Sequence, residues 1–293
     1  MRIGLFSSDP WSRRVEGLFE SLESKGTEVI RIMPWKVKQN LSHSDYCLEI
    51  KDRNLIDLDI VFVVDLGADD IGAFFHRLSL IHAIEEHGVR VINSSDALLK
   101  MRNKAECMRN LQKAGISIPE TLITESIEEA ADFVKRNSPC VLKPITGFGG
   151  LGVQLIEREF DLDNIFDFLK HHSRMFGKGA FLLQQYIRNS GFDIRALVIN
   201  DRVIGTMQRV ATQGIVTNIH SGGIARENDI DVNTVAVDAA KAVNGNLAGV
   251  DIIPDISGKF WVLEVNATPG WAGLQTVSQI DITDAIASWL IEF

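Results

Sequence analysis

The first third of the chain alternates short apolar runs with longer amphipathic stretches, and this alternation restricts the fold more than any other feature of the sequence. The apolar, strand-like runs are Arg2–Phe6, Thr27–Met33, Asp59–Asp65 and Val89–Asn93. A helix is predicted over Trp11–Gly26, and a second helix runs through His87 and stops at Gly88. Strands separated by helices in this way predict a parallel sheet. No glycine fingerprint follows the first strand, so a dinucleotide site is not expected there.

The rest of the chain mixes helices with a strand-rich C-terminal part. Helices are predicted over Ser94–Gly115, Thr124–Arg136, Asp161–His172 and Asn233–Val243, with one more at the C-terminus. The apolar run Pro139–Lys143 is strand-like and leads into a glycine-rich loop, and from Ala180 onward strands dominate. This order predicts a mixed α/β (α+β) fold, with boundaries near Asn93 and Ala180.

Composition excludes several classes of function. The chain has 293 residues and a formal net charge of −9, which argues against broad binding to nucleic acid phosphates. The three cysteines, Cys47, Cys107 and Cys140, fit neither a zinc spacing nor a disulfide framework. No run approaches the ~18 apolar residues of a membrane helix, and the first apolar run is too short for a signal sequence. The sequence therefore predicts a cytoplasmic enzyme or binding protein without a membrane or nucleic acid partner.

Two apolar runs flank a turn near the C-terminus, in Ala248–Asn266. With Ser257 and Gly258 as the central turn residues, symmetric pairing sets Asp251 opposite Glu264. Directly opposed carboxylates repel each other, so a cation is expected between them. Together with Asn266 they offer only oxygen ligands, which suits Mg²⁺ or Mn²⁺ and argues against zinc.

The strand period of two defines the faces of the second strand of this hairpin. It puts Glu264 and Asn266 on one face with Phe260 and Val262, and sets Trp261, Leu263 and Val265 on the other. The spacing alone is equally consistent with an exposed hairpin whose polar face is hydrated.

A glycine-rich loop follows the strand-like run that ends at Lys143. Gly147, Gly149 and Gly152 match G-x-G-x-x-G, but a strand-like run follows instead of the helix that a Rossmann loop opens, and Gly150 loosens the turn further. A strand–loop–strand hairpin of this kind can cover phosphates with its backbone N–H groups. Lys143 lies beside the loop, where triphosphate oxygens are expected. The alternative is a surface lysine whose ammonium reaches solvent.

Other polar residues stand at the ends or along the faces of later strands. They are Asp193, Arg195, Arg209, Asn218 and His220. Each of them alone fits a surface or structural role better than a functional one, and His220 matches no metal spacing.

Several motifs in one order resemble the ATP-grasp superfamily, and most closely its RimK-type glutamate ligases. The stretches that carry the resemblance are NSSDALLKMRNKAECMRNLQKAGISIPET, VLKPITGFGGLGV, LLQQYI, FDIRALVINDRVI, NIHSGG, AGVDII and VLEVNATPG. The resemblance covers about Asn93 to the C-terminus. It implies three subdomains, at 1–93, 94–181 and 182–293, with ATP between the central and C-terminal ones.

The resemblance also implies roles for individual residues. Lys104 and Lys143 would contact phosphates, and Gly147, Gly149, Gly150 and Gly152 would form a flap over them. Gln184, Gln185, Tyr186 and Ile187 would hold adenine, Asp193 would approach the ribose, and Asn218 would belong to the ATP-binding residues. Asp251, Glu264 and Asn266 would bind two Mg²⁺ (or Mn²⁺) ions. Arg195 and Arg209 would serve catalysis by holding the reacting carboxylate or the transferred phosphoryl group.

The implied reaction is ATP-dependent amide formation through an acyl phosphate. An amino acid, expected to be glutamate, would be added to a carboxylate-bearing small molecule or cofactor such as a pterin by a homodimer or homotetramer. Gln185 stands where the family commonly has glutamate, and Val216 and Ser221 stand where it typically has arginines. These departures leave the ATP chemistry untouched but leave open a protein or peptide acceptor or another amino acid. Two alternatives of other kinds are a non-catalytic nucleotide-binding protein on the same fold and a kinase that stops at the phosphorylated acceptor.

Overall fold

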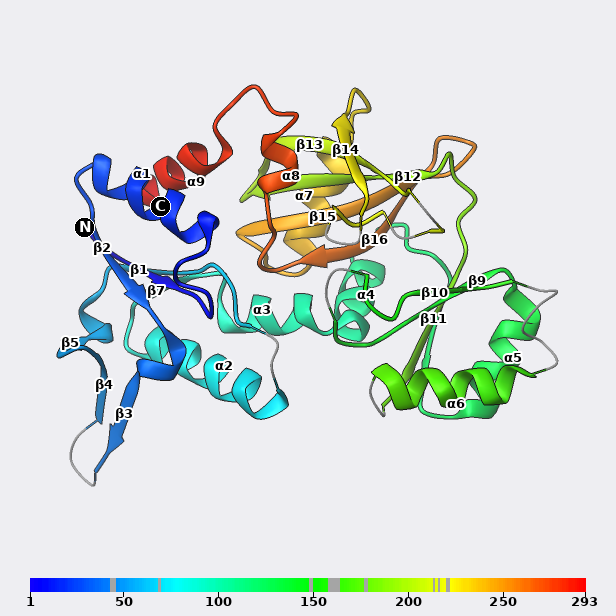
Figure 1. Cartoon of the computed structure of the whole chain (residues 1–293), viewed down its shortest axis with the longest axis horizontal. Helices are drawn as coiled ribbons and strands as arrows, with labels where there is room; N and C mark the ends of the chain where they lie inside the picture. The colour runs from blue at the N-terminus through cyan, green and yellow to red at the C-terminus, as the bar shows by residue number, and fades with distance from the viewer. Residues whose placement is uncertain are drawn as a thin grey trace.

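A computed structural model describes residues 1–42, 46–67, 70–147, 150–157, 164–176, 179–212, 214–215, 217–219 and 222–293. The chain begins with the predicted parallel sheet, whose strand order is β2-β1-β6-β7. Its strands are β1 (Arg2–Phe6), β2 (Glu28–Ile32), β6 (Ile60–Val63) and β7 (Arg90–Ile92). The connecting helices are α1 (Arg13–Ser24) and α2 (Ile71–Glu86). The strand–helix alternation predicted from the sequence is thus confirmed (Figure 1).

A small antiparallel sheet interrupts this part of the chain, and the sequence did not indicate it. Its strands are β3 (Lys38–Leu41), β4 (Tyr46–Ile50) and β5 (Arg53–Asn54), with the short 3₁₀ turns η1 (Pro34–Lys36) and η2 (Leu55–Asp57) on either side. Its core side chains come from β4, where Leu48 and Ile50 are fully buried. The other strands are polar, which explains why their hydrophobic pattern was too weak to predict them.

The central sheet is antiparallel, with the order β10-β9-β11-β8. Its strands are β8 (Thr121–Thr124), β9 (Cys140–Lys143), β10 (Gln154–Ile156) and β11 (Phe181–Gln185). The helices α5 (Ile127–Asn137) and α6 (Ile165–Phe176) pack together against this sheet (Figure 1). The boundary predicted between residues 181 and 182 falls inside β11.

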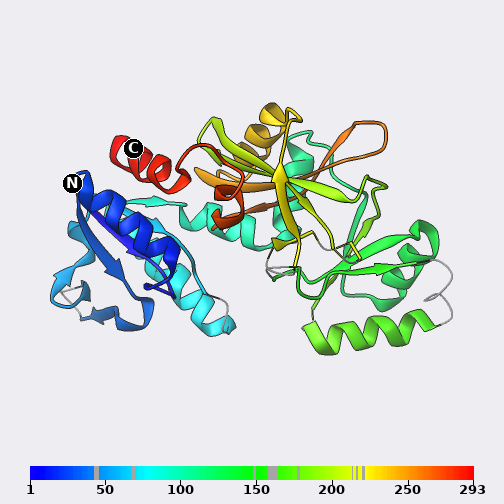
Figure 2. The same ribbon diagram turned by 45° about the horizontal axis from the view of Figure 1, so that its top comes forward.

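The C-terminal sheet is also antiparallel and has the order β14-β13-β12-β15-β16. Its strands are β12 (Phe192–Ile199), β13 (Arg202–Val210), β14 (Ile224–Glu227), β15 (Leu247–Pro254) and β16 (Phe260–Asn266). One face packs on α7 (Asn233–Ala242), and the other packs on α8 (Ala272–Gln275) and α9 (Ile282–Glu292). The last helix, α9, also lies beside α1, so the end of the chain joins the first and last sheets (Figure 2).

The single helix predicted over Ser94–Gly115 is wrong in one respect, because it is broken at Asn103. The segment forms α3 (Ser95–Arg102) and α4 (Lys104–Lys113). Asn103 has φ −90° and ψ 102°, and its side chain accepts hydrogen bonds from two backbone N–H groups of α4, as an N-cap does. The break makes Lys104 the first residue of α4, and its backbone N–H donates to the carbonyl of Ile145 at 3.2 Å.

Within the described ranges, no helix is both long enough and apolar enough to cross a bilayer.

Candidate active site

Charged side chains form a row across four neighbouring strands of the C-terminal sheet. Arg209 on β13 is the register partner of Asp193 on β12, and Arg195 on β12 is the partner of Asp251 on β15. Asp251 is in turn the partner of Glu264 on β16. Side chains of directly opposed residues lie within contact distance, so the sheet itself assembles this group of two guanidiniums and three carboxylates.

The predicted pairing of Asp251 with Glu264 is confirmed, but it arises differently from the symmetric count. The strands β15 and β16 are joined by a longer turn than predicted, in which Asp255 N–H donates to the Lys259 carbonyl at 2.9 Å. This shifts the register by one residue near the turn. A β-bulge between Asp251 and Ile252 then opposes Ile252 to Val262 and leaves Leu263 as the extra residue, which restores the predicted pair.

The same bulge overturns the predicted faces of β16. Val262 and Val265 are both buried in the core, whereas Leu263 and Glu264 both line the pocket described below. Glu264 therefore does not share a face with Val262, and Leu263 does not point away from Glu264. A bulge places two neighbouring side chains on one side of a strand, which a strict period of two does not allow.

The arginines of the row hold both aspartates in a buried network. Arg209 donates to Asp193 through Nε at 2.8 Å and through Nη2 at 2.6 Å, and its Nη2 also lies 2.9 Å from Oδ2 of Asp251. Arg195 binds Asp251 through Nε and Nη2. Thr217, which the sequence did not single out, donates to Asp193 at 2.7 Å. These are paired, charge-assisted hydrogen bonds, which fix the geometry of the group.

The network shifts the pKa of its members. Burial opposes ionisation of Asp251, but Arg195 and Arg209 outweigh it and hold the pKa of that carboxyl well below its usual range. Burial likewise opposes the charge on Arg209, but Asp251 and Asp193 outweigh it and raise the pKa of the guanidinium. Both groups are therefore ionised at neutral pH.

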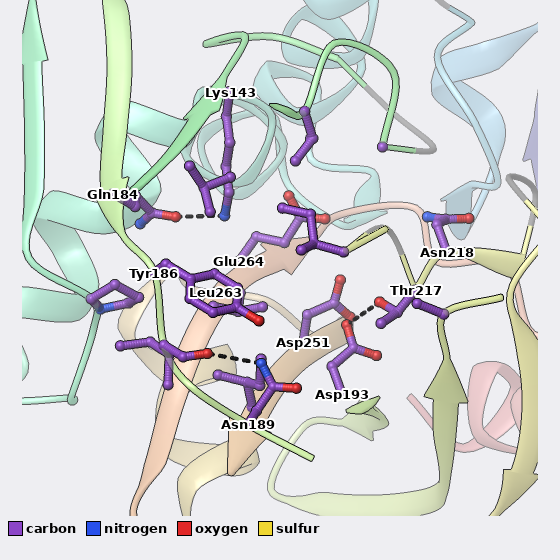
Figure 3. A pocket seen from close by; sticks show the side chains of 18 of the residues that line it. Lys143, Gln184, Tyr186, Asn189, Asp193, Thr217, Asn218, Asp251, Leu263 and Glu264 are labelled. Carbon is purple, nitrogen blue, oxygen red and sulfur yellow. Dashed lines mark hydrogen bonds between the residues drawn. The ribbon is translucent and has the colours of Figure 1, made fainter. Parts of the chain in front are cut away.

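A pocket lies between this row and the central sheet, with about 1140 Å³ of space when the adjoining open solvent is included. Its lining contains most of the residues that the sequence analysis placed at ATP: Lys104, Lys143, Gly147, Gly150, Gln184, Gln185, Tyr186, Ile187, Asp193, Arg209, Asn218, Asp251 and Glu264. Figure 3 shows Lys143, Gln184 and Glu264 directed into the same space from β9, β11 and β16. The residues predicted from separate motifs thus converge on one cavity.

Two lysines enter the pocket from different elements. Lys104 Nζ lies 3.5 Å from Oε2 of Glu264 and donates to the Gly147 carbonyl at 3.3 Å. Lys143 donates to Oε1 of Gln184, whose own amide donates to Thr121 at 3.0 Å. Burial lowers the pKa of Lys143, Glu264 opposes this effect and Lys104 adds to it. An anion in the pocket would stabilise the charged form of Lys143.

The glycine-rich loop joins two paired strands, as predicted. β9 and β10 are antiparallel, with Leu142 opposite Gln154. Gly152 has φ +77°, and a Cβ there would lie 2.9 Å from atoms of Phe176 and Pro144. His172 on α6 hydrogen-bonds the Gly152 carbonyl at 2.7 Å through Nε2. Helix α6 therefore holds this end of the loop, and only glycine fits at position 152.

The oxygen-bearing residues of the row suit a magnesium ion. Asn266 Nδ2 lies 3.5 Å from Oδ2 of Asp251, and Glu264 is the register partner of Asp251. Within the described ranges, no group of three or more His, Cys, Asp and Glu residues is placed to hold a metal. Mg²⁺ is commonly bound by one or two carboxylates and substrate phosphates, without a complete protein cage, so two carboxylates and an amide fit it.

Some predicted residues lie elsewhere or outside the described part of the chain. Arg195 and Asn266 line a second, adjacent pocket, and Arg209 and Asn218 line both. The positions of Gly149, Val216, His220 and Ser221 lie outside the described residues. Besides Thr217, the sequence analysis missed Leu263 and Asn189, which line the first pocket. Leu263 directly precedes Glu264, but the strand period of two placed it on the other face, and Asn189 stands in no motif that could have indicated it.

Comparisons with known proteins agree with this geometry. Residues 101–290 match the model of the RimK-like ATP-grasp domain. The chain is 31% identical to the tetrahydromethanopterin:alpha-L-glutamate ligase of Methanocaldococcus jannaschii, over 95% of this chain and 94% of that protein. It is 30% identical to a probable alpha-L-glutamate ligase of Shewanella denitrificans, over 99% of this chain and 97% of that protein.

Two solved structures have a similar fold at low sequence identity. The ATP-grasp ligase PsnB, in complex with a minimal precursor, aligns with a TM-score of 0.75 at 21% identity, over 99% of this chain and 98% of that one. A RimK domain ATP-grasp protein from Sphaerobacter thermophilus aligns with a TM-score of 0.74 at 21% identity, over 99% of each chain.

Proposed function

Because the chain belongs to the RimK-like ATP-grasp family and is an ATP-grasp ligase, we propose that it adds L-glutamate to the carboxylate of an acceptor. ATP would be cleaved to ADP and phosphate in the process. The observation that carries the proposal is the convergence of Lys104, Lys143 and Glu264 on the pocket that faces the charged row. The names of two relatives at 30 and 31% identity support glutamate as the amino acid.

In this proposal the first pocket holds ATP. The segment Gln184–Ile187 lies against adenine, and Asp193 lies near the ribose. Lys104 and Lys143 contact the phosphates, and the loop from Gly147 to Gly152 covers them. Asn218, which lines both pockets, would contact the nucleotide at the side that faces the acceptor.

Asp251, Glu264 and Asn266 would hold two magnesium ions in this site. When bound, Mg²⁺ offsets the negative charge that the phosphates carry and develop during transfer. The oxygen-only donor set supports this assignment. Mn²⁺ prefers the same oxygen donors, so it would be able to take the place of Mg²⁺ in this site.

The residues of the chain would bind, orient and shield the reactants. A carboxylate oxygen of the acceptor attacks the γ-phosphorus of ATP, and the bond to the β–γ bridging oxygen breaks, which releases ADP. The glutamate amine then attacks the acyl carbon, loses a proton, and expels phosphate. Arg195 and Arg209 would hold the carboxylate or the phosphoryl group, because a guanidinium can bind either one through paired hydrogen bonds. The glycine loop would exclude water, which would otherwise hydrolyse the acyl phosphate.

A small-molecule or cofactor acceptor such as a pterin is proposed on the name of one relative alone, the tetrahydromethanopterin ligase. A peptide or protein acceptor, or a different amino acid, would use the same chemistry. The mass of the product separates these cases, because each acceptor and each amino acid gives a characteristic mass.

The test is a screen for ADP release from ATP and Mg²⁺, with glutamate and a panel of carboxylate acceptors. We expect release only when both acceptor and glutamate are present, with the product heavier by one glutamyl residue. A stable phosphorylated product without glutamate would indicate a kinase instead. Nucleotide binding without turnover for any acceptor and amino acid would indicate a non-catalytic protein.

A further inference from the structure

A second pocket, with about 1830 Å³ of open-sided space, adjoins the first at Arg209 and Asn218. It lies between the N-terminal sheet and the C-terminal sheet. One wall is the loop after β6, at Asp65–Gly67, together with the first turn of α1. The segment Thr268–Gly273, which includes Trp271, forms another part of the lining.

Positive charges outnumber negative charges in the lining of this pocket. Arg195 and Arg209 also line it, but each is engaged by a buried aspartate, as described above. The remaining charged residues of the lining are Arg13, Arg14 and Arg102 against Asp65. Among the described residues of the lining, two positive charges are therefore in excess.

The carboxylate of Asp65 already accepts several hydrogen bonds from nearby loop residues. It accepts hydrogen bonds from the backbone N–H of Ser8 at 2.9 Å and of Gly67 at 3.1 Å. The hydroxyls of Ser7 and Ser8 also donate to it. Arg14 approaches this carboxylate only to 3.7 Å, beyond hydrogen-bond distance. Asp65 thus offers the arginines charge but no paired hydrogen bonds.

Among the described residues, Arg14 and Arg102 donate hydrogen bonds only to backbone carbonyls, and their guanidiniums lie over the rings of Trp271 at 5.6 Å and Phe74 at 5.9 Å. Arg14 donates to the carbonyls of Pro269 at 3.2 Å and Thr268 at 3.4 Å, and Arg102 donates to that of Gly67 at 3.2 Å. A guanidinium has five N–H donors, so most of theirs stay available for a ligand. Burial lowers the pKa of both groups, although Asp65 and, for Arg14, also Asp9 oppose this shift, so the nearby negative charge is too small to offset desolvation.

We propose that Arg14 and Arg102 form a subsite for an oxyanion of the acceptor, remote from the carboxylate that reacts. The inference rests on the proposed function: the acceptor carries at least two acidic groups. One reacts beside Arg209 and Asn218, and the other binds at Arg14 and Arg102. The remote group is a carboxylate or a phosphate monoester, because a guanidinium binds either one through paired hydrogen bonds.

The experiment measures anion binding to the full chain saturated with Mg²⁺ and a non-hydrolysable ATP analogue, so that the nucleotide pocket is filled. Calorimetric titrations use glutarate, inorganic phosphate and the uncharged diamide glutaramide as probes. They are repeated on Arg14→Gln, Arg102→Gln and, as a matched control, the exposed Arg136→Gln on α5. Affinity for the ATP analogue checks that each variant is folded, and Arg14→Lys and Arg102→Lys replace a glutamine variant that fails this check.

We expect the affinity for the preferred anion to fall about tenfold or more in Arg14→Gln and in Arg102→Gln, and to stay within about twofold in the control. Tighter binding of glutarate indicates a carboxylate, and tighter binding of phosphate indicates a phosphate monoester. A merely structural role would not distinguish glutarate from glutaramide. Equal affinity for these two probes, or unchanged anion affinity in both variants, would overturn the subsite. Because no turnover is needed, this result is independent of whether ligation is found.

Discussion

Arg195 and Asp251 face each other directly on β12 and β15, and the guanidinium binds the carboxylate through two nitrogens. Arg209 lies 2.9 Å from the same carboxylate. A residue proposed as a metal ligand is therefore balanced by two guanidiniums in the structure described here. Under the proposed function, Asp251 shares its charge between these arginines and the metal, so the arginines and the metal site should be energetically coupled.

The first prediction concerns the stability of this network. Arg209→Met removes a buried partner of two aspartates, and we expect it to lower the free energy of unfolding by about 3–5 kcal/mol at neutral pH. Arg53→Met, which breaks an exposed pair with Glu28, should cost about 1 kcal/mol or less. Denaturant unfolding followed by circular dichroism measures both. If Arg209→Met lowers the free energy of unfolding by no more than Arg53→Met does, the buried network does not stabilise the fold as predicted.

The same variant predicts a pH dependence. Burial raises the pKa of Asp251, but Arg195 and Arg209 lower it by more, so the folded-state pKa of Asp251 is depressed. A depressed pKa stabilises the fold above the unfolded-state pKa, about 3.9, and this contribution is lost as the pH falls toward the folded-state value. The difference in the free energy of unfolding between wild type and Arg209→Met should therefore be constant from about pH 8 to 5 and should become smaller below about pH 4. A difference that grows on acidification would contradict the assignment.

The next prediction tests the metal assignment. Glu264→Gln keeps the shape of the side chain but removes its charge, so we expect ADP formation to fall about 100-fold or more, with the unfolding transition preserved. Raising the Mg²⁺ concentration should recover part of the activity. Glu227→Gln, on the exposed strand β14, is the control and should behave like wild type. Wild-type activity in Glu264→Gln would remove Glu264 from the metal site.

Lys143 should take up protons when nucleotide binds. Burial lowers its pKa, Glu264 opposes this shift and Lys104 adds to it. The lysine thus loses its proton at a lower pH than usual, and negative phosphates should restore the charged form. Calorimetry of ATP-analogue binding in two buffers of different ionisation enthalpy should show net proton uptake in the alkaline range below the ordinary lysine pKa. The uptake should disappear in Lys143→Met and persist in the exposed Lys135→Met. If proton uptake persists in Lys143→Met, a group other than Lys143 takes up the proton.

The glycine loop gives a steric prediction. In Gly152→Ala the new methyl group would lie 2.9 Å from Phe176 and Pro144, and the residue would keep an unfavourable positive φ. We expect the KM for ATP to rise about tenfold or more, because the clash would displace the loop from the position in which it covers the phosphates. Gly179→Ala, which meets nothing within 4 Å, is the control. Equal KM values in the two variants would show that the position of Gly152 does not affect ATP binding.

The sequence predicted elements whose patterns are local and strong. The parallel strands and their helices were recognised because each buries an apolar face of clear period. The helix break at Asn103 was missed because the surrounding residues are helix-compatible, and only the cap geometry stops the first helix. The pairing of Asp251 with Glu264 was right because two deviations cancelled: a longer turn and a bulge at Leu263.

Contacts between distant segments were beyond the reach of the sequence analysis. Arg14 and Pro269, which meet in the second pocket, are 255 positions apart. An arginine in the first turn of a helix is ordinarily a surface residue, and only the tertiary fold brings this one to the carbonyls of Thr268 and Pro269. Thr217 likewise has no motif of its own, and its contact with Asp193 depends on the fold.

The most direct measurement follows the oxygen of the reacting carboxylate. The acceptor found in the ADP screen is labelled with oxygen-18 in the carboxylate that becomes the amide, and the released phosphate is analysed by mass spectrometry. If ATP activates that carboxylate, each phosphate should carry one labelled oxygen atom, because the acyl phosphate passes it on when glutamate attacks. Unlabelled phosphate, formed while the amide product accumulates, would contradict carboxylate activation and with it the proposed reaction.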